Sequence, residues 1–336
     1  MVEVTRGRIV ESRHFGAAAV VDAGGHVLAA WGDVEQPVYP RSSIKMVQAL
    51  PLLETGAAEA YALTDAEVAI ACASHAGSAA HLTTVAGMLA RIGADDAALA
   101  CGPRRPGDEA EQAELVRAGE KPRRIHNCCS GKHAGMILAA RHMGQPIAGY
   151  HRPEHAVQQR VAGAMEQMTG LDLDAAPRSA DGCSLPIWAL PLGNLALAMA
   201  RIADPHDQPE PRQAAIARLW QAQAAAPEMV DGHGGFVTET IRLAAGGVVI
   251  KNGAEGVQVA AIRDAGVGIA VKIADGADRA AQVAIAALLL RFADAAGDLR
   301  AHLLQAAEAP VSTFAGDQVG VIRPAAGWLP LPGAAA

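Results

Sequence analysis

Residues 247–273 read GVVIKNGAEGVQVAAIRDAGVGIAVKI, which is three apolar segments separated by turns that contain Gly and Asp. The segments 247–251, 256–263 and 266–273 are rich in Val, Ile and Ala, and this pattern predicts three β-strands. Near the N-terminus, residues 7–13, 16–21 and 27–31 have the same character, and Ala23–His26 forms a tight turn before the last of them. We therefore expect strands at both ends of the chain.

The middle of the chain has a helical pattern instead. Helix-forming segments are expected at 65–72, 78–92, 109–118, 131–142, 153–169 and 211–225. A further helix is expected over 42–53, kinked or shortened by Pro51, and another over 277–293.

Strands and helices do not alternate along the chain, so the pattern does not fit a doubly wound sheet. It predicts an α/β (α+β) fold in one domain, 1–336, whose sheet is assembled from both chain ends. The sheet subregion is expected at about 1–40 and 245–330, and the inserted helical subregion at about 57–230. We expect the last residues, 329–336, to fray.

Composition excludes several classes of protein. The chain has 336 residues, 51% of them hydrophobic and 19% charged, with a net charge of -7, which is typical of a globular protein and not of a nucleic-acid-binding one. The N-terminus lacks a signal-peptide pattern, and the longest apolar run, 283–290, is too short for a bilayer. Five cysteines form an odd set, which favours reduced thiols or metal ligands over a disulfide framework. A cytoplasmic location is expected.

The first chemical motif is Arg41-Ser-Ser-Ile-Lys45, which follows loop prolines and begins a helical pattern. Residues three apart lie on one helix face, so the Lys45 amine is expected to reach the Ser42 hydroxyl and activate it as a nucleophile. Lysine can serve as a base because its amine can lose a proton, which arginine does not do in proteins. The alternative is that Ser42 caps the helix and Lys45 is a solvated helix residue.

The second motif is Ile250-Lys251-Asn252-Gly253, in which a lysine ends an apolar strand. It resembles the Lys-Thr-Gly strand of serine β-lactamases and penicillin-binding proteins, with Asn in place of Thr. The alternative interpretation is a strand-end lysine at a turn.

Two more motifs concentrate thiols, hydroxyls and imidazoles. They are Cys72-Ala-Ser74-His75 and His126-Asn-Cys-Cys129-Ser-Gly-Lys132-His133. Cys129 and His133 are four residues apart, and with Cys183 they form a candidate zinc site, although buried structural thiols are an equal alternative. The segment does not form a phosphate-binding loop, because the Gly required four residues before the Gly-Lys pair is missing.

Together with Asp181-Gly-Cys183-Ser-Leu-Pro, these motifs resemble the bacterial asparaginase II family of the Rhizobium etli type, the class 3 L-asparaginases. The resemblance extends over nearly the whole chain. It implies a serine β-lactamase-like or penicillin-binding-protein-like fold, a homodimer, and the hydrolysis of L-asparagine to L-aspartate and ammonia. The segments typical of asparaginases with a threonine nucleophile are not evident.

The resemblance also implies roles for particular residues. It pairs Ser42 with Lys45 and Ser74 with Lys251 as catalytic tandems, and it implies a zinc ion bound by Cys129, Lys132 and Cys183. A lysine that binds zinc must be a free amine, which requires a strongly lowered pKa and predicts that acid weakens metal binding. The remaining expected substrate contacts are Arg41, His133, Asp181 and Ala254, the last as an oxyanion donor with the Ser42 N–H.

Two other functions fit the same residues. One is a zinc-dependent amidohydrolase in which metal-bound water attacks, and the other is a non-catalytic member of the fold that binds an amino acid. Hydrolysis of β-lactams is disfavoured, because a cytoplasmic chain does not meet that substrate.

Overall fold

The structure is a computed structural model that describes residues 1–329. The chain divides into two compact units. The first, the sheet unit, comprises residues 1–43, 190–204 and 239–329 of the described chain. The second, the helical unit, comprises residues 44–189 and 205–238. No helix in the described part of the chain is long and apolar enough to cross a membrane.

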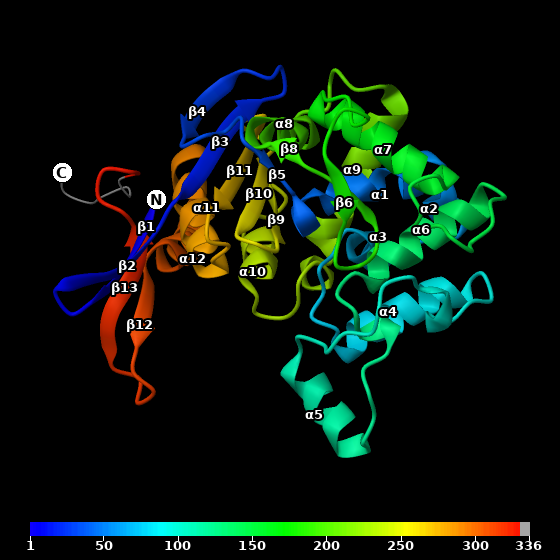
Figure 1. The fold of residues 1–336 in the computed structure, drawn as a ribbon, viewed down its shortest axis with the longest axis horizontal. Coiled ribbons are helices and arrows are strands. Elements are labelled where there is room, and N and C mark those ends of the chain that lie inside the picture. The colour runs from blue at the N-terminus through cyan, green and yellow to red at the C-terminus, as the bar shows by residue number, and fades with distance from the viewer. Residues whose placement is uncertain (330–336) are drawn as a thin grey trace. The chain divides into compact units, whose positions relative to one another are not determined.

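A five-stranded antiparallel sheet is the centre of the sheet unit (Figure 1). Its order is β4 (Val27–Trp31), β3 (Gly16–Asp22), β11 (Val267–Ile273), β10 (Val257–Ile262) and β9 (Val248–Gly253). The strands β3 and β11 pair from Gly16–Ile273 to Asp22–Val267. This pairing confirms the predicted α/β class with a sheet built from both chain ends.

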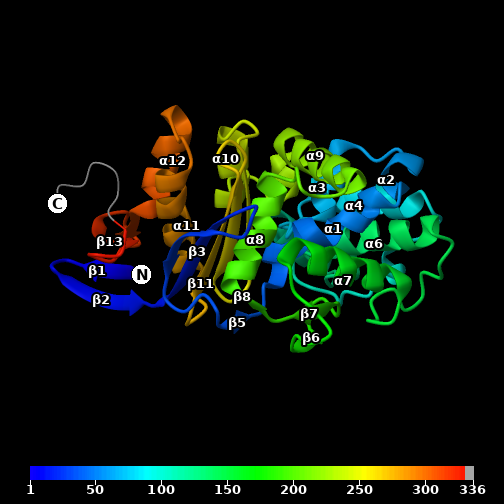
Figure 2. The same ribbon diagram turned by 90° about the horizontal axis from the view of Figure 1, so that it is seen from above.

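Helices cover both faces of this sheet. Figure 2 shows α8 (Leu192–Ala203) on one face and α11 (Asp278–Phe292) on the other. Every residue of β10 is buried, which explains why its sequence is apolar at all positions except Gln258 and does not alternate. A Cβ atom at Gly268 would lie 2.1 Å from the Ala196 carbonyl oxygen, so α8 fits closely on β11 only because that position has no side chain.

The position of α8 corrects the sequence analysis, which placed residues 190–204 in the helical subregion. No helix was predicted over these residues, and helical periodicity does not in any case identify the surface that a buried helix face contacts. Here the apolar face of α8 packs on strands from both ends of the chain.

A second, four-stranded sheet completes the sheet unit. Its order is β12 (Ala309–Ser312), β13 (Gln318–Pro324), β1 (Val2–Arg6) and β2 (Ile9–His14), and α12 (Gly297–Ala307) packs on α11 beside it. Of these elements the sequence predicted only the segment around β2. Fraying was expected for residues 329–336. Leu329 is instead buried, and residues 330–336 lie outside the described part of the chain.

The remaining two strand pairs are short. The pair β5 (Pro37–Val38) and β8 (Leu190–Pro191) belongs to the sheet unit, and β6 (Arg178–Ala180) with β7 (Pro186–Trp188) belongs to the helical unit.

The helices of the helical unit match the predicted segments closely. They are α1 (Lys45–Glu54), α2 (Ala57–Ala60), α3 (Asp65–Ala71), α4 (Ala79–Ala90), α5 (Glu109–Ala118), α6 (Ser130–His142), α7 (Ala156–Thr169) and α9 (Glu210–Ala225). Short 3₁₀ turns lie at Asp96–Ala98, Arg124–His126 and Pro227–Met229, and α10 (Phe236–Leu243) spans the chain boundary between the units. Pro51 does not shorten α1, which continues to Glu54 with contacts to α6, α7 and α9.

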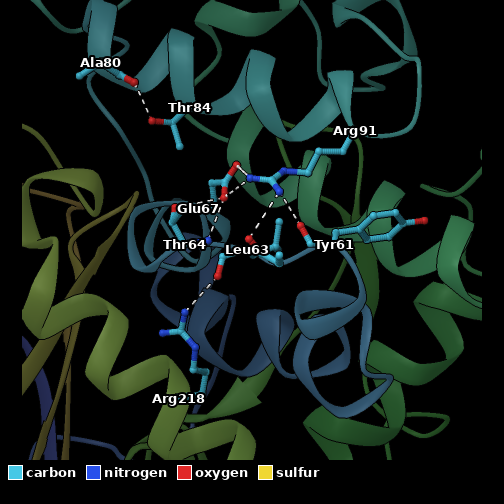
Figure 3. A network of polar contacts seen from close by, with 9 residues as sticks. Tyr61, Leu63, Thr64, Glu67, Ala80, Thr84, Arg91 and Arg218 are labelled. Carbon is cyan, nitrogen blue, oxygen red and sulfur yellow. Dashed lines mark hydrogen bonds and ion pairs between the residues drawn. The ribbon is translucent and has the colours of Figure 1, made fainter.

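A polar network fixes the start of α3 (Figure 3). Thr64 and Glu67 form a capping box, and the Arg91 guanidinium donates to both Glu67 carboxylate oxygens at 2.6 and 2.7 Å. Arg218 donates to Asp65 in the first turn of the same helix. Because α3 ends directly before Cys72, this network helps to set the position of the loop that carries Ser74.

Candidate active site

Ser42 lies in a tight turn that precedes α1. Residues Arg41–Ile44 form a 3₁₀ helix, so α1 begins at Lys45 and not at Ser42 as expected. The Ser43 backbone N–H and hydroxyl both donate to the Pro40 carbonyl, at 3.2 and 2.7 Å, which accounts for this tighter turn. Arg41 has a φ of 53°, an uncommon conformation for a residue with a side chain.

The end of β9 lies against this turn. A Cβ atom at Gly253 would lie 2.7 Å from the Pro40 carbonyl oxygen and 3.4 Å from the Ser42 nitrogen. Gly253 therefore permits a close approach that any other residue would obstruct. The sheet unit thus brings the Lys-Asn-Gly strand and Ser42 together, although more than 200 residues separate them in the sequence.

Three other predicted site residues lie near this strand end. Lys251 is fully buried, and its amine donates to the backbone and side-chain oxygens of Asn252. Ala254 is exposed in the turn that follows β9. The Arg41 guanidinium lies 3.9 Å from the carboxylate of Glu255 in the same turn.

Lys45 and Ser74 form a direct contact in the helical unit. The Lys45 side chain is fully buried, and its Nζ atom donates to the Ser74 hydroxyl oxygen at 3.0 Å and to the Ala73 carbonyl. A buried amine beside a serine hydroxyl is an arrangement that can activate a nucleophile or transfer a proton. This contact was not predicted, because the resemblance paired Lys45 with Ser42 and Ser74 with Lys251. Those two pairings stay predictions.

Backbone hydrogen bonds hold the Ser74 loop from three directions. The Ser74 N–H donates to the Val230 carbonyl, the His75 N–H to the Cys128 carbonyl and the Ala76 N–H to the Asp231 carbonyl. The loop is therefore rigidly placed although it has no regular secondary structure.

His75 connects this loop to the first residue of α6. Its Nε2 atom lies 2.9 Å from the Ser130 hydroxyl, which itself donates to the Ile125 carbonyl. The single hydroxyl proton of Ser130 is thereby used, so His75 Nε2 carries the proton of its hydrogen bond. Burial, together with His81 and Lys45, lowers the pKa of His75 well below its usual value.

Cys129, Lys132 and Cys183 form a buried cluster, which we call the thiol–amine cluster. The Lys132 amine donates to Cys183 Sγ at 3.4 Å and to Gln48 Oε1 at 3.4 Å. The Cys183 thiol donates to the Asp181 carboxylate at 3.5 Å. The pKa of Cys129 is well below its usual value, because the Cys128 and Cys183 thiols hydrogen-bond to its sulfur.

The donor set of this cluster fits zinc. Two sulfur atoms and one nitrogen are ligand types that zinc accepts, and Cys129 favours the thiolate form that binds metal. The hydrogen bond to Cys129 and burial raise the pKa of Cys183, so this thiol must lose its proton to bind a metal. In the described part of the chain, no three His, Cys, Asp or Glu side chains are arranged to hold a metal.

The charge state of Lys132 differs from the expectation. Burial lowers its pKa, but Cys183, Cys129 and Asp181 raise it by more, so the pKa lies above its usual value. The sequence analysis expected a strongly lowered pKa, because it considered the requirement of the metal and not the negative charges around the amine. A metal ion at this site must therefore displace a proton from Lys132.

His133, which follows Lys132 in α6, is fully buried and contacts Tyr150. Its Nδ1 atom lies 2.5 Å from the Tyr150 hydroxyl, which also accepts from the Ala100 N–H at 2.8 Å. Burial and the neighbouring Lys132 lower the pKa of His133 to about 3, so the ring is neutral.

The predicted residues thus fall into two sets. Arg41, Ser42, Lys251 and Ala254 belong to the sheet unit, and Lys45, Ser74, Cys129, Lys132, His133, Asp181 and Cys183 belong to the helical unit. The sequence analysis missed Gln48 and Tyr150. Gln48 had a signal, since it is a polar residue on the buried, mostly apolar helix α1, whereas Tyr150 follows a loop and had none.

Comparison with known proteins identifies the family. A buried lysine that contacts a serine hydroxyl is typical of hydrolases with a Ser–Lys pair. The chain matches the L-asparaginase II family over residues 2–324, and it belongs to this family of asparaginase-type hydrolases.

Other comparisons are more distant. A β-lactamase from Mycobacterium bovis is similar in structure, with a TM-score of 0.44 and 15% sequence identity, over 82% of this chain and 94% of that chain. A comparison with curated proteins gives no match.

Proposed function

We propose that this protein hydrolyses L-asparagine to L-aspartate and ammonia through a serine nucleophile activated by lysine. Membership of the L-asparaginase II family supports the substrate class. The observation that carries the mechanism is the hydrogen bond between Lys45 Nζ and the Ser74 hydroxyl, made by a fully buried amine. Ser42 lies in the 3₁₀ turn Arg41–Ile44, and Lys45 follows it by three residues as the first residue of α1. We therefore assign Lys45 as the base for Ser42.

In the proposed first step, Lys45 in its free-amine form takes the proton of Ser42, and Ser42 Oγ bonds to the side-chain amide carbon of asparagine. The C–N bond then breaks, the proton passes to the nitrogen, and ammonia leaves. Ser74, which is bonded to Lys45, relays protons. Water hydrolyses the β-aspartyl ester, which releases aspartate and restores Ser42.

Backbone N–H groups are proposed to stabilise the negative charge that develops on the carbonyl oxygen. Those of Ser42 and Ala254 are the candidates, since the close approach of Gly253 to the Ser42 nitrogen places the two segments side by side. Arg41, His133 and Asp181 are the proposed substrate contacts, and Lys251 is the second proposed catalytic lysine.

We propose zinc as a cofactor held by Cys129, Lys132 and Cys183. Bound to these three residues, zinc would supply a fixed positive charge able to orient a substrate carboxylate. A homodimer in the cytoplasm remains our proposal for the assembly and its location.

The Ser42→Ala variant tests the mechanism. We expect ammonia release from asparagine to fall about 10³-fold or more, because no other group replaces the nucleophile. Ser312→Ala, at an exposed position of β12, is the control, and it should retain most of the turnover.

Mass spectrometry of the substrate-trapped enzyme should locate an aspartyl group on the peptide that contains Ser42. An adduct on the peptide that contains Ser74 would transfer the nucleophile role to that residue. Full turnover by Ser42→Ala would refute the assignment of Ser42.

A further inference from the structure

Gln48 makes a contact that the proposed mechanism does not use. It lies on α1, one helical turn after Lys45, and is only 6% exposed. Its Oε1 atom accepts a hydrogen bond from Lys132 Nζ at 3.4 Å. A glutamine at a buried helix position is costly unless its amide is hydrogen-bonded, so this contact gives the residue a physical reason to be there.

The surroundings of Lys132 make this contact selective. Lys132 is 3% exposed, and its other contact with a side-chain acceptor is the Cys183 sulfur at 3.4 Å. Gln48 and Lys132 also line an internal cavity of about 10 Å³, which is about the size of one water molecule. Its other lining side chains are apolar, namely Ala49, Pro51, Leu52, Ala71, Met136, Ala139 and Val157, with the backbone of Gly135 between them. Among the side chains that line this cavity, Gln48 is thus the one that offers the Lys132 amine an acceptor.

The chemistry of the amide oxygen determines what this contact does. The oxygen can accept an N–H but cannot donate, so it fixes one N–H of Lys132 in the direction of α1. Rotation of the amine about its C–N bond is then restricted, and a second N–H is directed at Cys183 Sγ. If the amine loses its proton, its lone pair is already oriented, so binding a metal ion costs less rotational entropy.

Gln48 also shares a helix face with Lys45, since residues i and i+3 are neighbours on a helix. One face of α1 therefore contacts the Ser74 hydroxyl through Lys45 and the thiol–amine cluster through Gln48.

We propose that Gln48 is a positioning residue for Lys132 that strengthens zinc binding by the thiol–amine cluster. The inference rests on the zinc part of the proposed function. It assigns to Gln48 no contact with substrate.

The test is zinc affinity, measured on the purified full chain by competition with a chromophoric chelator. We expect Gln48→Leu to raise the Kd for zinc about 10- to 100-fold, which is the usual effect of removing a partner of a metal ligand. The matched control is Gln223→Leu, which makes the same change at a glutamine that is 1% exposed and whose Oε1 atom has no hydrogen-bond partner in the described part of the chain. Its zinc Kd should equal that of the wild type.

Gln48→Glu separates positioning from a general loss of packing, because it keeps an acceptor oxygen at the same place along the side chain. If Gln48 acts as the acceptor for Lys132, the zinc Kd of Gln48→Glu should lie closer to that of the wild type than the Kd of Gln48→Leu does. An equal or larger loss of zinc affinity in Gln48→Glu would overturn the inference.

The remaining outcomes are also decisive. A wild-type zinc Kd in Gln48→Leu, or no zinc binding by the wild type, overturns the inference whether or not the enzyme releases ammonia. Weakened binding in Gln48→Leu supports it even if the wild type proves inactive on asparagine, so failure of the catalytic proposal is recorded separately.

Discussion

At the scale of single residues, the helical unit buries several titratable side chains: lysine amines, a cysteine that favours the thiolate form, and histidines. The Lys45 and Lys132 amines are buried, and they lie near Cys129, whose pKa is lowered to favour a thiolate. His75 and His81 stack on one another with ring centroids 5.0 Å apart, and burial is the largest cause that lowers the pKa of each. A neutral buried histidine has a direct consequence for stability in acid.

The folded protein keeps His75 and His81 neutral at pH values where the unfolded chain binds protons. Above a pH of about 6.5 neither state is protonated at these rings, and below it the unfolded state gains protons first. Stability therefore falls as the pH drops from about 6.5, by up to about 1.4 kcal/mol per pH unit for each histidine.

We expect His75→Gln to reduce this slope by about 1 kcal/mol per pH unit. Glutamine keeps an N–H donor for Ser130 but does not titrate. Urea unfolding of metal-free protein between pH 7.5 and 5 measures the effect. Equal slopes for variant and wild type would contradict the assignment of a neutral His75.

At the scale of elements, glycine decides how closely α6 approaches α3. A Cβ atom at Gly131 would lie 2.4 Å from the Ile70 carbonyl oxygen and 2.8 Å from Ile70 Cγ1. Gly131 directly precedes Lys132, so the helix contact and the position of the thiol–amine cluster depend on the same residue.

Gly131→Ala should lower the free energy of unfolding by about 1–3 kcal/mol, because the two helices must move apart. Gly163→Ala on α7 is the control, since nothing lies within 4 Å of its Cβ position. That variant should be stabilised by about 0.5–1 kcal/mol, because alanine favours the helix. Chemical denaturation compares the two, and a neutral effect of Gly131→Ala would show that α6 can shift without cost.

At the scale of the whole molecule, the sheet unit exposes apolar side chains at its strand edges. β2 and β4 are edge strands of their sheets, and Ile9, Phe15, Val27 and Leu28 on or next to them are each more than half exposed. Exposed apolar edge strands favour association with another chain.

We therefore expect twice the chain mass of 34.4 kDa in light scattering after gel filtration. Leu28→Glu should shift this species to the monomer, because a buried unpaired charge opposes association. Val116→Glu on α5, which is also exposed, should leave the mass unchanged. A monomeric wild type would refute the homodimer, and a dimeric Leu28→Glu variant would place the interface elsewhere.

Much of the architecture could be predicted because its signals are local. Apolar segments bounded by glycine predict β9, β10 and β11, and helical periodicity predicts most helices of the helical unit to within a few residues. The elements that were missed include β1, β12, β13 and α12. No residue of β12 or β13 is fully buried, β1 has only five residues, and α12 has only three buried side chains, so their apolar patterns are weak.

The sequence by itself determined which chemical groups are present and where the local elements lie. Ordered motifs identified the family, because five of them in one order are highly specific. Only the tertiary structure decided which groups meet: Lys45 with Ser74, Gly253 with the Ser42 turn, and Gln48 with Lys132. The physical reason is that side-chain pairing across 29 or 84 residues depends on how helices pack and where loops are held, and a local pattern contains neither.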